Sequence, residues 1–539
     1  MTNFSLSIRR FRVAVLLAAS VLPWRADTVR AAKLSRPNIL WISCEDISPN
    51  LGCYGDRYAV TPNLDALAGQ GALFTHCYSH AGVCAVARSG LITGMYPPSI
   101  GSQHMRSRIV PPPYVKCFTE YLRAAGYYCT NRSKTDYNFE PPLTAWDESS
   151  RRTRDWRGRK PGQPFFSVIN LMISHEHYIW PSTYKELHHD PAKAILPSYF
   201  PDTPATRRDQ ARYADIITEM DRQAGEILRR LKADGLENDT IVFFWGDHGA
   251  GLPRAKRWVY ESGTRVPLIV RWPGRIKPGS VRDDLVGFID FAPTVLSLAG
   301  VRVPSHMQGQ VILGDRTAPP RRYIFSYRDR MDEAYDLIRG LRDKRFQYIR
   351  NFMPQRTYAQ NIGYMNKMPT MQEMRRLYAA GQLKEPQALF FRKTKPIEEL
   401  YDLTRDRDEV HNLVGQVKFQ KTLARMRTAL EKLQVKIGDR GLIPEPVLME
   451  QMRPGGVYAV TKKPTVRVTR RGKDRTVHVT LSCPTVGASI AYTTQTGRRV
   501  RWRLYSKPVR LPARGTLRVI ACRLGYRNSP EVRMTLNAR

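Results

Sequence analysis

The sequence predicts an α/β protein in which a mixed, mostly parallel sheet is sandwiched by helices. Its 539 residues suffice for a large core and a second module. Helical periodicity separates short apolar runs along the chain, and such an alternation favours a sheet with helices on both faces. The apolar runs have the character of buried strands and occupy residues 37–44, 165–173, 240–245 and 266–271.

Other segments fit the same plan. Residues 61–67 carry the polar cap and early proline of a helix start. A short strand is expected at 127–130. The apolar positions of 213–231 keep helical spacing, and Gly235 ends that helix.

After residue 322 the pattern changes to short strands, a loop-rich stretch and a late helix. The strands are expected at 336–342 and 346–351, the loops at 358–395 and the helix at 418–435. Alternating apolar residues with frequent turns then predict a small β-sandwich. The expected parts are a leader (1–32), an α/β domain (33–322), a smaller α+β subdomain (323–453) and the β-sandwich module (461–539).

The N-terminus has the layout of a secretory signal. Arg9, Arg10 and Arg12 precede the apolar run 13–22, and a small-residue region ends at Ala32. No later run of about 18 apolar residues occurs, so we expect an exported, periplasmic or extracellular protein that does not span a membrane. Its eight cysteines are too few for a disulfide scaffold. If a bridge forms, Cys483 and Cys522 are the first pair to test.

The charge balance predicts attraction to polyanions. The net charge is +38, from 86 Lys and Arg against 48 Asp and Glu. No zinc-finger, RNP or helix-turn-helix pattern is present, so nucleic acid is not the expected partner and a sulfated glycan fits instead. Residues 461–539 hold 19 basic residues and two acids. This module is either a contact surface for an anionic glycan or a stabilising appendage.

The most informative motif is CAVAR, from Cys84 to Arg88, at a turn-to-helix boundary. The spacing places thiol and guanidinium on one face of the first helical turn. Acids follow two of the predicted strands, where open α/β sheets place their ligands. Oxygen ligands of this kind suit a divalent cation. These residues are Glu45 and Asp46 after the first strand, and Asp247 and His248 after the strand at 240–245.

Together these motifs resemble the type I sulfatases of the alkaline phosphatase superfamily, over residues 37–413. The resemblance implies an alkaline-phosphatase-like fold and oxidation of Cys84 to formylglycine by a maturase. It also implies Ca²⁺ or another divalent cation. The implied metal ligands are Glu45, Asp46, Cys84, Asp247 and His248. Three positions depart from the usual pattern: Val86 replaces Pro or Ala, Glu45 replaces Asp, and His248 replaces Asn.

The resemblance also implies roles for basic residues. Arg88 would fix the hydrated aldehyde, Lys134 would contact sulfate, and His175 would protonate the leaving group. Lys256 occupies a sulfate-binding position, with Arg257 as the alternative. The catalytic set is thus Cys84, Arg88, Lys134, His175 and Lys256, and the substrate-binding set is Lys134, His175, Lys256 and Arg257. Many sulfatases carry a histidine where this chain has Asp136, and that role stays open.

Within the family, residues 42–50 and 101–106 are most similar to the heparan N-sulfatase (sulfamidase) branch, which acts on N-sulfoglucosamine. Pocket loops decide the substrate, so a polysaccharide O-sulfatase is an alternative. A phosphoester or phosphonate hydrolase of the same superfamily would share fold and metal ligands. A non-enzymatic polyanion-binding protein would explain the charge without any site.

Overall fold

A computed structural model describes residue 1 and residues 36–183, 186–469, 476–497 and 500–536. The predicted leader, 1–32, lies outside the described residues apart from Met1. Residues 36–539 form one compact unit. No helix in the described part is long and apolar enough to cross a membrane.

A nine-stranded sheet forms the centre of this unit, in the order β4-β3-β5-β1-β6-β7-β2-β8, with β9 beside β2. Its strands are β1 (Asn38–Cys44), β2 (Ala72–Tyr78), β3 (Tyr128–Arg132), β4 (Glu148–Ser150), β5 (Phe165–Leu171), β6 (Thr240–Gly246), β7 (Arg265–Arg271), β8 (Ser280–Arg282) and β9 (Val286–Gly287). Only β7 runs antiparallel to its neighbours, β6 and β2. The prediction of a mixed, mostly parallel sheet is confirmed.

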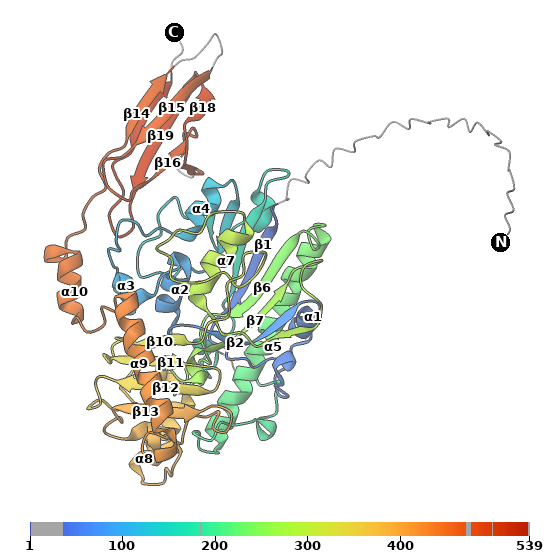
Figure 1. Cartoon of the computed structure of the whole chain (residues 1–539), viewed down its shortest axis with the longest axis vertical. Helices are drawn as coiled ribbons and strands as arrows, with labels where there is room; N and C mark the ends of the chain where they lie inside the picture. The colour runs from blue at the N-terminus through green and yellow to red at the C-terminus, as the bar shows by residue number, and fades with distance from the viewer. Residues whose placement is uncertain (2–35, 184–185, 470–475, 498–499, 537–539) are drawn as a thin grey trace. The chain divides into compact units, whose positions relative to one another are not determined.

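Alternate side chains of β1 enter two different hydrophobic clusters, as expected for a strand buried on both faces. Leu40 and Ile42 pack with α1 (Pro62–Gly69) and α5 (Pro204–Ala233). Ile39 and Trp41 pack with α2, α4 and α7 on the other face (Figure 1). These helices span Cys84–Thr93, Phe118–Ala124 and Phe291–Leu298. The sheet is therefore covered by helices on both faces.

An antiparallel sheet follows, in the order β10-β11-β12-β13. Its strands are β10 (Ile324–Arg328), β11 (Ile338–Arg342), β12 (Phe346–Asn351) and β13 (Glu398–Asp402). Helix α9 (Gln420–Ile437) packs on it, and one hydrophobic cluster joins this sheet to the start of α2. Val86, the departure noted in the CAVAR motif, is fully buried in that cluster.

The stretch 358–395, expected to be loops, contains a helix, α8 (Pro369–Ala379). Pro369 stands at its first turn, and Met371 and Met374 are fully buried against the core. The sequence pattern does not reveal this helix, because only a few methionines form its apolar face within an otherwise polar segment. A second short helix, α10 (Glu445–Met452), follows α9.

The last segment forms two facing antiparallel sheets, β14-β15-β18 and β17-β16-β19-β20. The strands are β14 (Thr465–Thr469), β15 (Thr476–Ser482), β16 (Ser489–Thr493), β17 (Arg503–Tyr505), β18 (Val509–Pro512), β19 (Gly515–Cys522) and β20 (Val532–Leu536). All eight cysteines are free. Cys483 and Cys522 are therefore not bridged, and the Cys483 thiol instead donates to the carbonyl of Lys462 at 3.3 Å.

Candidate active site

The site lies where two neighbouring strands of the sheet end. Strands β1 and β6 are parallel and in register, with Cys44 opposite Gly246. The residues that follow them therefore meet at one edge. The amide of Asp247 donates to the carbonyl of Cys44 at 3.0 Å, and the amide of Asp46 donates to the Asp247 carboxylate at 3.0 Å. Glu45, Asp46, Asp247 and His248 are all fully buried there.

The orientation of His248 suits a metal ligand. Its Nδ1 lies 3.0 Å from the carbonyl oxygen of Gly249, which requires a proton on Nδ1 and leaves Nε2 as a lone-pair donor. That Nε2 lies 2.9 Å from Oδ1 of Asp46, and both atoms are buried without a hydrogen bond. Two acceptors so close repel each other unless a metal cation lies beside them or the ring takes up a second proton and forms an ion pair with Asp46. The residues present therefore fit a divalent cation.

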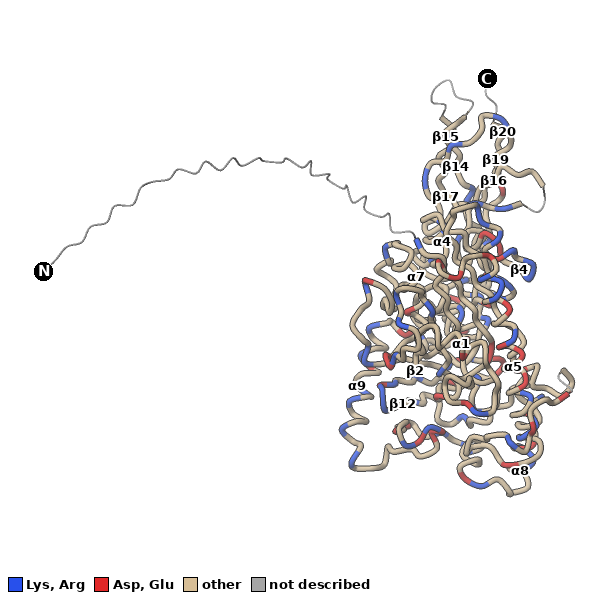
Figure 2. The backbone as a smooth tube through the Cα atoms, turned by 90° about the vertical axis from the view of Figure 1, so that its right-hand side faces the viewer, with Lys and Arg blue, Asp and Glu red and all other residues tan. Residues whose placement is uncertain are grey.

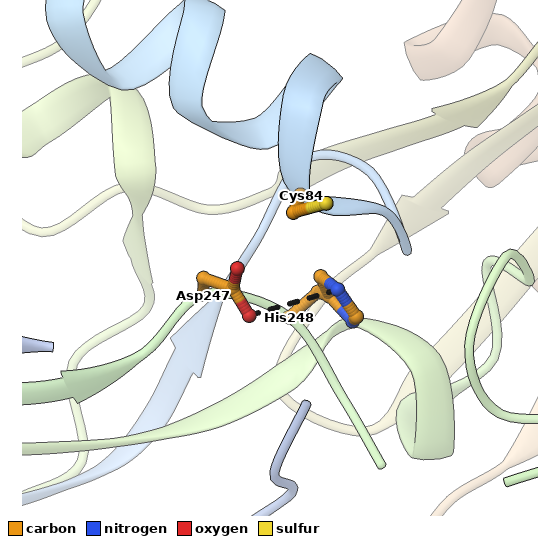
Figure 3. A group of neighbouring side chains, drawn as sticks. All are labelled: Cys84, Asp247 and His248. Carbon is orange, nitrogen blue, oxygen red and sulfur yellow. Dashed lines mark ion pairs between the residues drawn. The ribbon is translucent and has the colours of Figure 1, made fainter. Parts of the chain in front are cut away.

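Two groups of possible ligands lie side by side among the described residues. Cys84, Asp247 and His248 offer atoms within 4.8 Å of one another (Figure 3). Glu45, Asp46 and His175 form the second group within the same limit. The five ligands expected from the sequence are thus brought together, and His175 joins them.

Helix α2 begins at Cys84, directly above Asp247 and His248 (Figure 3). One turn later, Arg88 connects the ends of both strands. Its guanidinium lies 2.6 Å from Glu45 and 3.3 Å from Asp247, and it donates to the side chain of Asn170 at 2.8 Å. Arg88 therefore holds the carboxylates in place beside the helix start. Burial raises the pKa of the Cys84 thiol, so the thiol itself stays neutral.

Lys134 follows β3 and reaches the same acids. Its ammonium pairs with Glu45 and lies 3.5 Å from Asp136. The Cys84 thiol is also close enough to Asp136 to lower the pKa of that carboxyl group. The carboxylate at the position left open by the sequence therefore lies next to the predicted nucleophile.

Lys256 and Arg257 have different surroundings, although both are buried. The Lys256 ammonium lies 2.6 Å from Asp46 and 3.2 Å from Glu176. The two terminal nitrogens of Arg257 donate to the Glu176 carboxylate, at 2.7 and 3.0 Å, and its Nε donates to Asp332 at 2.5 Å. Lys256 thus contacts a predicted metal ligand, whereas Arg257 is engaged by two other acids.

His175 lies at the end of β5, half-buried, with its Nδ1 2.7 Å from Nδ1 of His177. One proton must be shared between these two nitrogens. If His177 donates it, His175 carries its own proton on Nε2. Burial and the nearby Lys256 lower the pKa of His175 to about 4, so the ring is neutral near pH 7.

The three central carboxylates do not ionise equally. Burial alone would raise the pKa of each, but Lys134 and Arg88 lower that of Glu45 to about 2. The Lys256 ammonium likewise holds the pKa of Asp46 well below its usual range. For Asp247, the effects of burial and of the neighbouring Glu45 exceed those of the nearby cations, so its pKa is raised. Asp247 is therefore the central carboxylate whose negative charge the neighbouring cations offset least.

Sequence reasoning missed three residues of the site. Glu176 anchors Lys256 and Arg257, Asn170 accepts from Arg88, and Asp332 accepts from Arg257. Glu176 adjoins His175, so its charge was a usable signal. Asn170 lies inside an apolar strand, and Asp332 lies in a loop after β10. Their roles follow only from the tertiary contacts.

Comparison with known proteins agrees with this geometry. Residues 37–301 match the family model Sulfatase, and residues 246–393 match the model N-sulphoglucosamine sulphohydrolase, C-terminal. An ulvan-active sulfatase of Formosa agariphila is 39% identical to the chain, over 93% of the chain and 91% of the relative. The chain belongs to the sulfatase family. Human N-sulphoglucosamine sulphohydrolase is 25% identical to this sulfatase, over 78% of the chain and 94% of the relative.

Solved structures show the same fold. The phosphonate monoester hydrolase of Silicibacter pomeroyi matches this sulfatase with a TM-score of 0.58 at 19% identity, covering 76% of the chain and 97% of the hydrolase. A structure in complex with D-glucosamine-2-N,6-O-disulfate matches with a TM-score of 0.56 at 18% identity, covering 76% and 99%. The alkaline-phosphatase-like fold expected from the sequence is confirmed.

Proposed function

We propose that this sulfatase removes sulfate from a polysaccharide by means of a formylglycine made from Cys84 and a divalent cation. The observation that carries the proposal is the meeting of Cys84 with buried acids from two strand ends, where the paired acceptors of Asp46 and His248 require a positive charge. The cation would be held by Glu45, Asp46, Asp247, His248 and the oxidised Cys84. Calcium is the first candidate, and the imidazole in the set leaves room for another divalent ion.

The modified residue would supply the attacking oxygen, and the cation would polarise the sulfate. The chain's own residues prepare that reaction. Arg88 fixes the carboxylates of both strands and adds positive charge beside the nucleophile. Lys134 and Lys256 line the site with ammonium groups that suit an anionic substrate. His175, with a proton on Nε2, would protonate the departing oxygen.

Sequence similarity favours a sulfate ester on a polysaccharide over the sulfamate of N-sulfoglucosamine. The 39% identical relative is ulvan-active, whereas N-sulphoglucosamine sulphohydrolase is 25% identical. Ulvan is therefore the first substrate to test. An N-sulfated sugar is the second.

The surroundings of His175 suit a charged sugar on the leaving-group side. Tyr364 lies against the ring of His175, with centroids 6.0 Å apart, and against Trp180 at 4.6 Å. The ammonium of Lys367 lies 5.0 Å from the centre of the Trp180 ring. Half-buried aromatic rings and a cation beside the proton donor favour contact with an anionic saccharide.

The test is sulfate release from a defined panel by protein matured in its own host. The panel contains ulvan oligosaccharides, an N-sulfated glucosamine, p-nitrophenyl sulfate and p-nitrophenyl phosphate. We expect release from ulvan to exceed release from the sulfamate, with little phosphatase activity. Formylglycine would be measured by mass spectrometry of the tryptic peptide 58–88, in which Cys77 serves as an unmodified internal control.

Two results would overturn the proposal. The first is protein with formylglycine that releases sulfate from none of these substrates. The second is phosphate release that exceeds every sulfate release, which would favour the phosphoester hydrolase. Metal content after dialysis, measured by elemental analysis, checks the cation without depending on activity. Addition of the bound metal to stripped protein should raise the melting temperature.

We further propose that residues 1–32 direct export and that a formylglycine-generating enzyme acts on Cys84. The support is the signal-like layout of the N-terminus and the CAVAR motif. Sequencing the N-terminus of the secreted protein tests the first point. Expression with and without a maturase tests the second.

A further inference from the structure

The loop of residues 101–109, here called the rim loop, presents two arginines to solvent. Every other residue of the loop is buried, whereas Arg106 and Arg108 are exposed. Both have left-handed backbones, with φ of +57° and +51°. Glycine adopts this conformation without cost, and arginine does not. Neither side chain is needed for packing, so its presence calls for another explanation.

The rim loop is held firmly in this conformation. The amide of Arg106 donates to the side chain of Asn138 at 2.7 Å, and that of Met105 donates to the carbonyl of Arg330 at 3.0 Å. The side-chain amide of Asn138 donates in turn to the carbonyls of Ser102 and His104, at 2.8 and 3.0 Å. The arginines therefore project from a fixed backbone.

Arg106 projects towards the nucleophile. Its Nε lies 3.7 Å from the carboxylate of Asp136, which lies close to the Cys84 thiol and 3.5 Å from the Lys134 ammonium. Asp136 thus anchors one edge of the guanidinium.

The other edge of this guanidinium is available. The side chain of Arg106 is 64% exposed, and its two terminal nitrogens have no hydrogen-bond partner in the part of the chain that the structure describes. The buried cations of the site differ in this respect. Arg88, Lys134, Lys256 and Arg257 are each paired with acids of the site at short distance. The two terminal nitrogens of Arg106 are therefore available to donate hydrogen bonds to an incoming carboxylate or sulfate.

We propose that Arg106, aimed by Asp136, binds a second anionic group of the substrate, beside the sulfate that is removed. The group is a carboxylate or a further sulfate on the same sugar or its neighbour. This inference rests on the proposed function. It identifies the preferred substrate as a saccharide with closely spaced negative charges.

Arg108 provides a matched control, because it shares the loop, the exposure and the backbone conformation, and its side chain makes no ion pair within the described residues. Binding of ulvan oligosaccharides would be measured with Cys84→Ala protein, so that no turnover interferes. We expect Arg106→Ala to weaken binding about 10- to 100-fold. This range corresponds to the usual contribution of a charge-assisted hydrogen-bonded pair to the free energy of binding. Arg106→Lys should weaken it less, and Arg108→Ala by less than about twofold.

Glycine variants separate folding from recognition. Arg106→Gly and Arg108→Gly should both raise the melting temperature, because each relieves a left-handed backbone. Only Arg106→Gly should weaken binding. Equal losses from both variants would show that only total charge matters and would overturn the proposal. Unchanged binding by every Arg106 variant would overturn it as well.

Modified oligosaccharides identify the anion. If reduction of the carboxylates removes the difference between wild type and Arg106→Ala, the bound group is a carboxylate. If only partial desulfation removes it, the group is a second sulfate. In the unmutated enzyme, no sulfate release from any substrate would refute the proposed function itself. Normal release with an Arg106 variant that binds normally would refute only this inference.

Discussion

The catalytic centre and the β14–β20 module are both rich in basic residues, but they use them in opposite ways. In the centre, Arg88, Lys134 and Lys256 are each paired with acids that follow β1 or β6. The module has 19 basic residues and only two acids. Figure 2 shows blue basic segments along its described strands. Exposed cations such as Lys507 and Arg514 have no ion-pair partner in the described structure. Net charge alone therefore does not reveal which cations act in a site.

The module contacts the catalytic part beside β3 and also next to the rim loop, where the Arg523 guanidinium donates to the carbonyl of Pro111 at 3.3 Å. Arg501 pairs with Glu148 at 2.5 Å, and Arg123 donates to the carbonyl of Trp502 at 2.9 Å. These two contacts lie near the start of β3, whereas Lys134 follows its end, so the strand of about 13 Å separates the two. The expected contact between module and glycan thus stays a prediction. The contacts themselves indicate a bracing role.

The sharpest test of the comparison removes the nucleophile. Cys84→Ala should reduce sulfate release to the assay background, since no other side chain at the start of α2 has nucleophilic chemistry. The fold should persist, with a melting temperature within about 3 °C of wild type, because the substitution removes one small buried atom. Calorimetry and ion chromatography of sulfate measure the two effects. Sulfate release that survives the substitution would exclude Cys84 as the nucleophile.

The next largest effect should separate two neighbouring cations. Arg257→Ala leaves Asp332 without this partner and Glu176 with only the Lys256 ammonium, and it should cost about 3–5 kcal/mol of unfolding free energy. Lys256→Ala should cost less unfolding free energy, because Glu176 keeps Arg257. Relative to that loss of stability, its loss of sulfate release should be larger than the loss caused by Arg257→Ala. Denaturant unfolding and sulfate release measure this. The opposite ranking would place Arg257 in the substrate site.

Much of this arrangement could be predicted from the sequence, because strand ends are marked by local patterns. The acids after β1 and β6 follow continuous apolar runs, and parallel strands bring such ends together. Spacing within CAVAR likewise placed Cys84 and Arg88 on one helical face. These features depend on residues that are close in sequence.

The remaining features depend on contacts between distant segments. Nothing local distinguishes Arg257, held by Glu176 and Asp332, from Lys256 one residue earlier. The pairing of Arg106 with Asp136 joins two loops and could not be read from either. The sequence likewise left open whether Cys483 and Cys522 pair, because shared membership of a small domain does not fix side-chain direction, and both are free.

A third test concerns the bracing role of the module. Leu524 is buried in the hydrophobic cluster of the catalytic sheet, so Leu524→Ala should cost about 2–5 kcal/mol. Leu517→Ala, inside the module's own core, is the matched control. Both variants should show a single unfolding transition in calorimetry, because residues 36–539 form one compact unit. A separate early transition for Leu517→Ala alone would show that the module unfolds independently.

The smallest effect should come from the module's exposed cations. A variant with three of them changed to Gln should leave turnover of p-nitrophenyl sulfate unchanged, because these residues belong to the β14–β20 module and not to the residues that form the site. It should nevertheless elute from a heparin column at lower salt than a control variant of equal net charge. The module substitutions are Arg503→Gln, Lys507→Gln and Arg514→Gln, and the control substitutions are Arg316→Gln, Lys421→Gln and Lys432→Gln. Equal elution of the two variants would mean that the module binds polyanions no better than the rest of the surface, which would leave bracing as its role.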